Sequence, residues 1–150
     1  MLKILILFLT VFTGITGYAG TFKVIGPCSE EPQFLEFFDL PEESNVGRVT
    51  VDLFERHSVP FVGTERGIAR VFDSPTGDEA LEVLNDSEML AYGWCYSVNG
   101  IEPGVYADEY PVSSEDQITW WYGYAHYKEG EWIEQCAPSY ERRSAYICGL

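Results

Sequence analysis

The sequence predicts an α+β fold, in which strands precede and follow one main helix. Two observations support this prediction. Several short stretches alternate between apolar and polar or between large and small side chains, which is the pattern of strands. One stretch, around residues 46–57, instead places its apolar residues at helical spacing. The 150 residues contain no repeat, low-complexity tract or linker, so they fit one domain.

The N-terminal half contains the first two expected strands and the main helix. Residues 21–25 alternate before a Gly-Pro pair, and residues 34–38 form the second strand before Pro41. Residues 48–57 are ambiguous, because their valines also alternate as in a strand. Asn45 can cap a helix here and Pro60 can end it, so we favour the helix.

The middle and the end of the chain contain the remaining elements. Residues 67–72 predict a strand, and the capping-box pattern at 76–79 predicts a short second helix that continues through Leu84. Residues 92–98 and 117–127 are strands with one bulky and one small-residue face, and Asn99-Gly100 is a hairpin-turn signal. Residues 131–136 complete a C-terminal hairpin, followed by an irregular tail.

The first 19 residues predict a signal peptide. Lys3 precedes an apolar stretch, and Gly17 and Ala19 provide the small residues that a signal peptidase requires before Gly20. A membrane anchor is the alternative, but Gly and Thr interrupt the stretch well short of the about 20 apolar residues of a spanning helix. We therefore expect a secreted or periplasmic protein, with residues 20–150 as its domain.

The cysteine count and the charge agree with this location. The four cysteines are all in the exported part, where an even number predicts two disulfides: Cys28, Cys95, Cys136 and Cys148. Their pairing stays open among three possibilities, and zinc is a poor alternative because no C-x-x-C pair occurs. The net charge of −15 argues against binding to nucleic acid or to an anionic membrane.

One motif resembles a known family. The segment Trp94-Cys-Tyr96-Ser-Val98-Asn99-Gly100 is similar to the W-x-Y-x-V-N-G signature of the transcobalamin C-terminal-like family, whose bacterial members carry a domain of unknown function. The resemblance extends to the segment Asp116–Trp120 and, upstream, to the helix and the following turn at residues 49–62.

This resemblance implies a β-grasp-like domain, with a mixed sheet wrapped on a helix. In transcobalamins the domain covers one face of a corrinoid, while a separate helical domain holds the other face. The present chain is too short for such a helical domain, and a fold alone does not determine a function. A corrinoid is therefore one candidate ligand among others.

Nothing in the sequence predicts an enzyme. It contains no G-x-S-x-G motif, and its cysteines are better explained as disulfides than as nucleophiles. His57 is best explained as a helix-end residue, whereas His126 is a weak candidate for ligand contact. The many acidic residues form chance pairs, so a hydrolase with paired carboxylates is a minor alternative. We expect no catalytic residue, no cofactor and no metal site.

The aromatic residues are the main candidates for binding. All nine Phe occur at or before Phe72, whereas all four Trp and every Tyr except Tyr18 occur at or after Tyr92. Trp and Tyr combine apolar rings with polar tips and can stack on a flat apolar or sugar-like ligand. The candidate ligand-binding residues are Trp94, Tyr96, Asn99, Trp120, Trp121, Tyr122 and Tyr127.

Burial is the alternative explanation for this aromatic face. The alternation would place Trp94 and Trp120 on the face that packs against the helix, and Trp121 and Tyr127 on the opposite face. We expect a noncatalytic binding module for a small molecule, corrinoid or sugar-like, or for a protein ligand. The rival is a secreted structural or protein–protein interaction domain, whose acidic surface meets a cationic partner.

Overall fold

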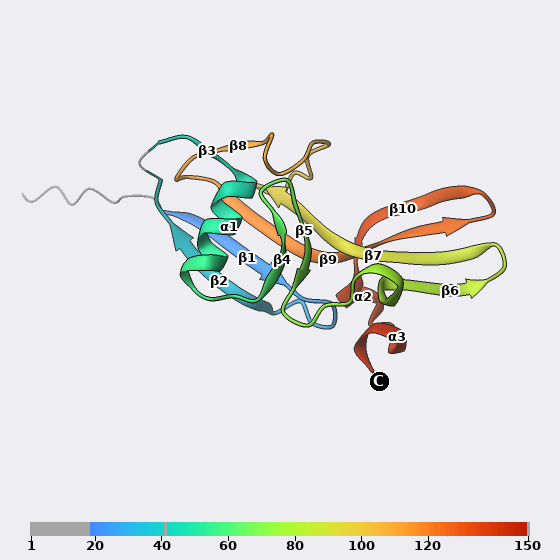
Figure 1. Ribbon diagram of the computed structural model, residues 1–150. Coiled ribbons are helices and arrows are strands. Elements are labelled where there is room, and N and C mark those ends of the chain that lie inside the picture. Colours follow the sequence, from blue (N-terminus) through green and yellow to red (C-terminus); the bar gives the residue numbers. More distant parts are fainter. Residues whose placement is uncertain (1–18, 41, 150) are drawn as a thin grey trace, which may run out of the picture.

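A curled sheet of six strands forms the main body of the protein, in a computed structural model that describes residues 19–40 and 42–149 (Figure 1). The strand order is β2-β1-β9-β7-β6, and β10 also pairs with β9. The strands are β1 (Gly20–Ile25), β2 (Pro32–Phe38), β6 (Leu81–Asn85), β7 (Glu88–Val98), β9 (Gln117–Lys128) and β10 (Glu131–Pro138). β1 is parallel to β9 and the other pairings of the sheet are antiparallel, so the sheet is mixed.

Helix α1 (Val46–Arg56) covers one face of this sheet (Figure 1). The Asn45 side chain caps it by accepting a hydrogen bond from the backbone N–H of Arg48 at 2.7 Å. Its buried apolar residues pack into the main core with the inner residues of β1, β7 and β9. The predicted α+β class, with a β-grasp-like sheet on one main helix, is confirmed.

Two short sheets flank the helix. One joins β3 (Ser44–Asn45) to β8 (Pro111–Val112), and the other joins β4 (Phe61–Thr64) to β5 (Gly67–Val71). The sequence predicted β5 but neither β3, β4 nor β8. The two-residue strands β3 and β8 have too few side chains to show an alternating pattern.

The predicted second helix is wrong over most of its length. Only the 3-10 turn η1 (Gly77–Ala80) forms, and the Thr76 side chain makes no capping hydrogen bond to it. The next residues form strand β6, because they pair antiparallel with β7 across a tight turn. The C-terminal tail, which was expected to be irregular, contains the short helices α2 (Ser139–Arg142) and α3 (Ala145–Cys148).

The cysteines form two disulfides, Cys28–Cys148 and Cys95–Cys136, as predicted. The first holds the C-terminal tail against the loop after β1, and the second joins β7 to β10. None of the four sulfurs is therefore a free thiolate that could bind zinc.

The predicted signal peptide lies outside the described residues, apart from Ala19. Within the described part of the chain, no helix combines the length and the apolar character needed to span a membrane.

Candidate functional site

The β7–β9 pair has two different faces, as its alternating residue sizes predicted. We call the face that carries the large side chains the bulky face: Tyr92, Trp94, Tyr96, Val98, Ile118, Trp120, Tyr122 and Tyr124. We call the opposite face the tight face: Ala91, Gly93, Cys95, Ser97, Thr119, Trp121, Gly123 and Ala125. The pairing between the two strands has no bulge from Glu88 to Val98, so each set stays on its own side.

The bulky face is mostly core. Trp120 is 2% exposed and Tyr122 is 0% exposed, so neither ring has a surface on which a ligand could stack. The Trp120 indole N–H donates to the Thr50 hydroxyl of α1 at 2.9 Å, which joins the sheet to the helix. Both rings are therefore buried, as the alternative for the bulky face expected. Trp120 packs under α1, whereas Tyr122 packs in a second core cluster with Ala80, Leu90 and Tyr92.

Tyr96 and Tyr92 are also part of this packed face. The Tyr96 hydroxyl donates to the Val105 carbonyl at 2.8 Å, and the Tyr92 hydroxyl donates to the Glu82 carboxylate at 2.6 Å. Burial raises the pKa of Tyr96 to about 12 and, with the Glu82 hydrogen bond, that of Tyr92 to about 12. Both phenols stay protonated near neutral pH and act as structural hydrogen-bond donors.

Asn99 has a structural role in the turn after β7. Its φ of 53° and the φ of 77° at Gly100 are left-handed, as a tight two-residue turn requires. The Asn99 amide donates to the Asp116 carboxylate at 2.7 Å and accepts from the Gln117 backbone N–H at 2.9 Å. Partial burial opposes ionisation of Asp116, but hydrogen bonds from Ser113 and Asn99 outweigh it and lower its pKa. Both ends of the Asn99 amide are thus engaged within the chain.

Strand β10 bends over the tight face. Cys136 has a left-handed φ of 54° at an irregularity of the β9–β10 pairing. Although β9 lies between β7 and β10, the Cα atoms of Cys95 and Cys136 are only 5.9 Å apart. Strands two positions apart in a flat sheet would be separated by about 10 Å, so the end of β10 must lie over β9. The Trp121 indole holds it there by donating to the Cys136 carbonyl at 2.8 Å.

The crossing of β10 requires a glycine at position 123. A Cβ atom added to Gly123 would lie 3.1 Å from the Ala137 carbonyl oxygen and 3.3 Å from the Cys136 carbonyl carbon. Both neighbours are backbone atoms close to the disulfide and have little freedom to move. Its register partner Gly93 lies directly opposite on β7, where an added Cβ would meet no described atom within 4 Å beyond its chain neighbours.

We expect Gly123→Ala to lower the free energy of unfolding by about 1 to 3 kcal/mol, because the methyl group overpacks the crossing. Gly93→Ala is the matched control, and we expect it to leave stability unchanged or to raise it by about 0.5 kcal/mol. Urea denaturation of both variants measures the difference. Equal effects of the two substitutions would contradict the crowded crossing.

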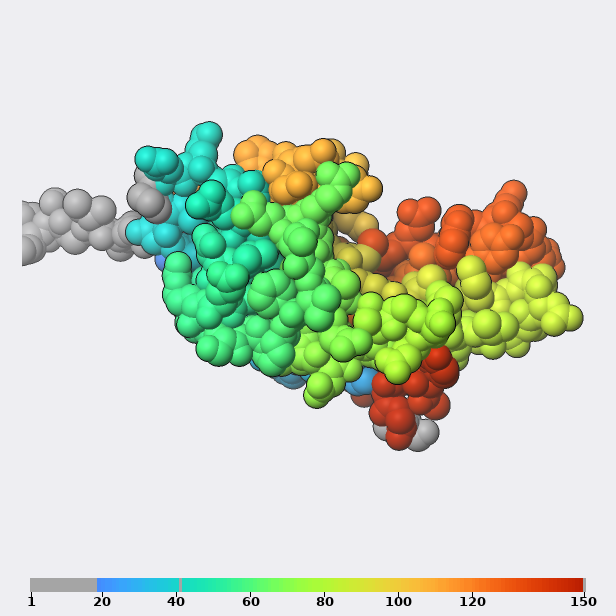
Figure 2. Space-filling model, viewed as in Figure 1, coloured from blue at the N-terminus to red at the C-terminus, as the bar shows by residue number. Residues whose placement is uncertain are grey.

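A groove of about 380 Å³ lies on the tight face beside this crossing. Its floor is Ala91, Gly93, Gly123 and Ala125, and its sides include Trp132, Gln135 and the Cys95–Cys136 disulfide. Ala91, Gly93 and Ala125 carry at most a methyl group and are half-buried, so the sheet backbone is accessible beside them, whereas Gly123 is buried beneath β10. Figure 2 shows the molecule hollowed in this region, between β10 and the loop that follows β7.

Trp132 was not among the predicted ligand-binding residues. It is 49% exposed and forms an edge contact with Tyr127, with 5.3 Å between the ring centroids. Tyr127 and Trp121 are half-buried on the same face, as their alternation predicted. Exposed aromatic surface is therefore present at the tight face. Trp132, and not Trp121 or Tyr127, provides the largest part of it.

A second hollow, also of about 380 Å³, lies on the other side of the sheet. The edges of Trp94, Tyr96 and Trp120 line it, together with Arg66 and Tyr106. The Arg66 guanidinium lies over the Tyr106 ring at 3.7 Å from its centroid, and the Trp94 indole N–H donates to the Ser74 hydroxyl at 3.0 Å. This hollow brings three of the predicted residues together, but their polar atoms already have partners within the chain.

Comparison with known proteins gives one family match. Residues 77–124 match a domain of unknown function (DUF4430), over the segment from η1 to most of β9. No curated protein matches the chain. A crystal structure of a protein from Ruminococcus gnavus, provisionally described as metal-binding, is similar at 23% identity and a TM-score of 0.47. The match covers 75% of the present chain and 98% of the other, but this likeness is too low to assign a fold or a ligand.

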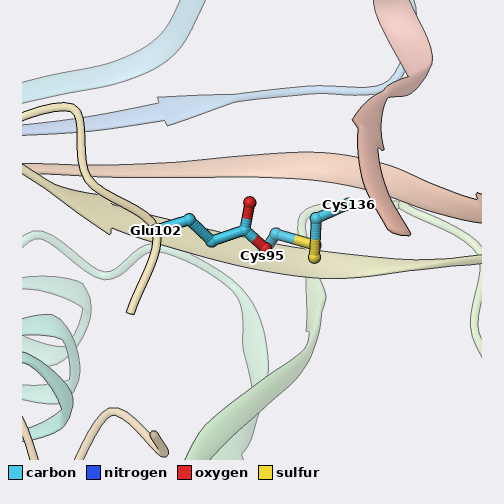
Figure 3. A group of neighbouring side chains, drawn as sticks. All are labelled: Cys95, Glu102 and Cys136. Carbon is cyan, nitrogen blue, oxygen red and sulfur yellow. A yellow bond between two sulfur atoms is a disulfide. The ribbon is translucent and has the colours of Figure 1, made fainter. Parts of the chain in front are cut away.

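One cluster in the present chain has the residue types of a metal site. Ligand atoms of Cys95, Glu102 and Cys136 all lie within 4.8 Å of one another, and Figure 3 shows Glu102 reaching towards the disulfide. Zinc binds the thiolate form of cysteine, whereas these two sulfurs are bonded to each other. Glu102 is the one carboxylate of the three, so the oxidised cluster does not fit a metal ion.

Proposed function

We propose that this protein is an exported, noncatalytic binding module that holds a flat, mainly apolar small molecule in the groove on the tight face. The observation that carries the proposal is the pairing of an open glycine and alanine floor with the exposed ring of Trp132. A flat ring can lie on such a floor in contact with the backbone, while an indole packs against its edge or face. At about 380 Å³, the groove is near the lower end of the range for ligand pockets.

Three further features support this function. The disulfide Cys95–Cys136 fixes one side of the groove, so the site is formed before a ligand arrives, which reduces the entropic cost of binding. Two disulfides suit an oxidising compartment. The resemblance to transcobalamin C-terminal-like domains makes a corrinoid the first ligand to test and sugars the second.

We expect Gly93→Val to abolish ligand binding without loss of stability. The valine side chain would project into the open groove and occupy the place of the ligand, whereas a β-branched residue suits a strand. Calorimetric titration with cyanocobalamin and with a set of oligosaccharides measures binding, and urea denaturation measures stability. We also expect Trp132→Ala to weaken binding about tenfold, since it removes a stacking partner.

Tyr106→Ala is the matched control, because Tyr106 is an exposed aromatic residue that lines the second hollow instead. This substitution is expected to leave binding unchanged. Loss of binding in Tyr106→Ala, with retention in Gly93→Val, would move the site to the second hollow. If none of the ligands binds to the wild-type protein, the small-molecule function itself is contradicted.

The alternative function is that of a secreted protein–protein interaction domain. It is favoured by β6, which is an edge strand of the sheet among the described residues, and in which Val83 is 72% exposed and Leu81 is 40% exposed next to acidic residues. An unprotected strand edge can pair with an extended segment of a partner. The distinguishing result would be capture of a basic protein, with an affinity that falls as salt increases.

A further inference from the structure

An exposed carboxylate, that of Glu102, lies beside the disulfide end of the groove, although Glu102 is not one of the residues that line the groove. The Glu102 carboxylate lies within 4.8 Å of the sulfurs of Cys95 and Cys136, which form the disulfide end of the groove. None of the ion pairs found among residues 19–40 and 42–149 involves Glu102. Neither Lys nor Arg occurs among the described residues that line the groove.

The two ends of the groove therefore differ in chemistry. Trp132 pairs with Tyr127 near the tip of the β9–β10 hairpin, whereas Cys95 pairs with Trp121 towards the opposite end. Between them the floor extends from Ala91 to Cys95, four residues along β7, which corresponds to about 13 Å of strand. A ligand that fills the groove would meet the Trp132 ring at one end and the disulfide at the other, where a group that extends past the sulfurs could reach the Glu102 carboxylate.

We propose that the groove selects a ligand whose flat apolar body carries a protonated amine, and that Glu102 is the counter-charge for this amine. The inference rests on the proposed function and specifies the chemical class of the ligand. A charge-assisted hydrogen bond from an ammonium to a carboxylate is about twice as strong as one between neutral groups. The net charge of −15 also raises the local concentration of cations and repels anionic competitors.

Three probes with the same aromatic body and different charge test this selectivity: 1-naphthylmethylamine, 1-naphthylmethanol and 1-naphthoate. Each has a flat two-ring body that fits within the length of the floor. We expect the wild-type protein to bind the amine about tenfold more tightly than the alcohol, and the carboxylate more weakly than both. Dissociation constants from calorimetric titration at low salt measure the order.

Glu102→Gln keeps the shape of the side chain and removes its charge. We expect it to weaken binding of the amine about tenfold and to leave binding of the alcohol unchanged, so that the preference disappears. Glu131→Gln is the matched control, since Glu131 is an exposed carboxylate at the hairpin end of β10. It should leave the preference intact, because Glu131 lies at the opposite end of the groove from Glu102 and solvent screens its exposed charge.

The outcomes separate the two proposals. If all three probes bind equally and Gly93→Val abolishes their binding, the charge selectivity is contradicted while the groove remains the binding site. The same holds if the preference for the amine survives in Glu102→Gln. If no probe binds, or if binding survives in Gly93→Val, the selectivity and the groove as the site are both contradicted.

Discussion

Replacing both Cys28 and Cys148 by serine is expected to lower the free energy of unfolding by about 4 to 5 kcal/mol. The two residues are 120 positions apart, so their bond restricts almost the whole unfolded chain of the described domain. The cost of losing a cross-link increases with the length of the loop that it closes. Chemical denaturation of the double variant beside the wild-type protein gives the difference directly.

The double variant of Cys95 and Cys136 provides the comparison. Their separation is 41 residues, and the chain-entropy relation predicts a loss smaller by about 1 kcal/mol. The two double variants should also differ in ligand binding. Cys95 and Cys136 line the groove, whereas Cys28 and Cys148 do not. The prediction would be contradicted if loss of the Cys28–Cys148 bond lowered the free energy of unfolding by less than about 1 kcal/mol. The unfolded chain would then gain little conformational freedom when this bond is absent.

Replacing Trp120 by alanine is expected to lower the free energy of unfolding by about 3 to 5 kcal/mol. The side chain is 2% exposed and is the largest of the fully buried residues, so its removal leaves a cavity between the sheet and α1. Its ring also packs on Tyr96, with the centroids 5.1 Å apart. Thermal and urea denaturation of the variant measure the loss.

Trp120→Phe removes the N–H donor together with part of the indole, so the hydrogen bond is isolated by combining it with a substitution of Thr50. This variant keeps most of the ring but loses the donor to the Thr50 hydroxyl, and we expect a loss of about 1 to 2 kcal/mol. Thr50→Val removes the acceptor, so a double-mutant cycle of the two gives the coupling between helix and sheet. A coupling near zero would contradict the hydrogen bond as a link between these elements.

Local patterns were sufficient to predict most of the fold. The helix at 46–56 could be distinguished from a strand because its apolar spacing, the Asn45 cap and a downstream proline all agree. The long strands β7 and β9 are regular for many residues, and their alternation is therefore clear. The turn at Asn99 and Gly100 followed from a dipeptide that tolerates positive φ.

The error at β6 shows where local patterns fail. Thr76 and Glu79 form a valid capping box in the sequence, yet only one 3-10 turn follows. Residues 81–85 pair with β7 instead, and the gain from this pairing exceeds a weak local preference for helix. Such competition depends on a partner strand, which a short window of sequence does not contain.

The candidate site could be predicted only in part. The alternation placed the candidates Trp121 and Tyr127 on the small-residue face, where the groove lies. Four other candidates lie on the bulky face and were selected because aromatic residues are common in binding sites: Trp94, Tyr96, Trp120 and Tyr122. Burial of Trp120 and Tyr122 depends on α1, η1 and the C-terminal tail, all of which pack from elsewhere in the chain. The bend of β10 depends on a left-handed φ at Cys136, a residue with no local preference for it.

The long cross-link also affects what happens when the backbone is cut. Any single proteolytic break between residues 28 and 148 leaves two fragments that the Cys28–Cys148 bond still joins. A nicked molecule would thus keep the mass of the intact one on a nonreducing gel and separate only after thiol treatment. In a protease-rich environment, the protein would lose a peptide bond in an exposed loop without releasing either fragment.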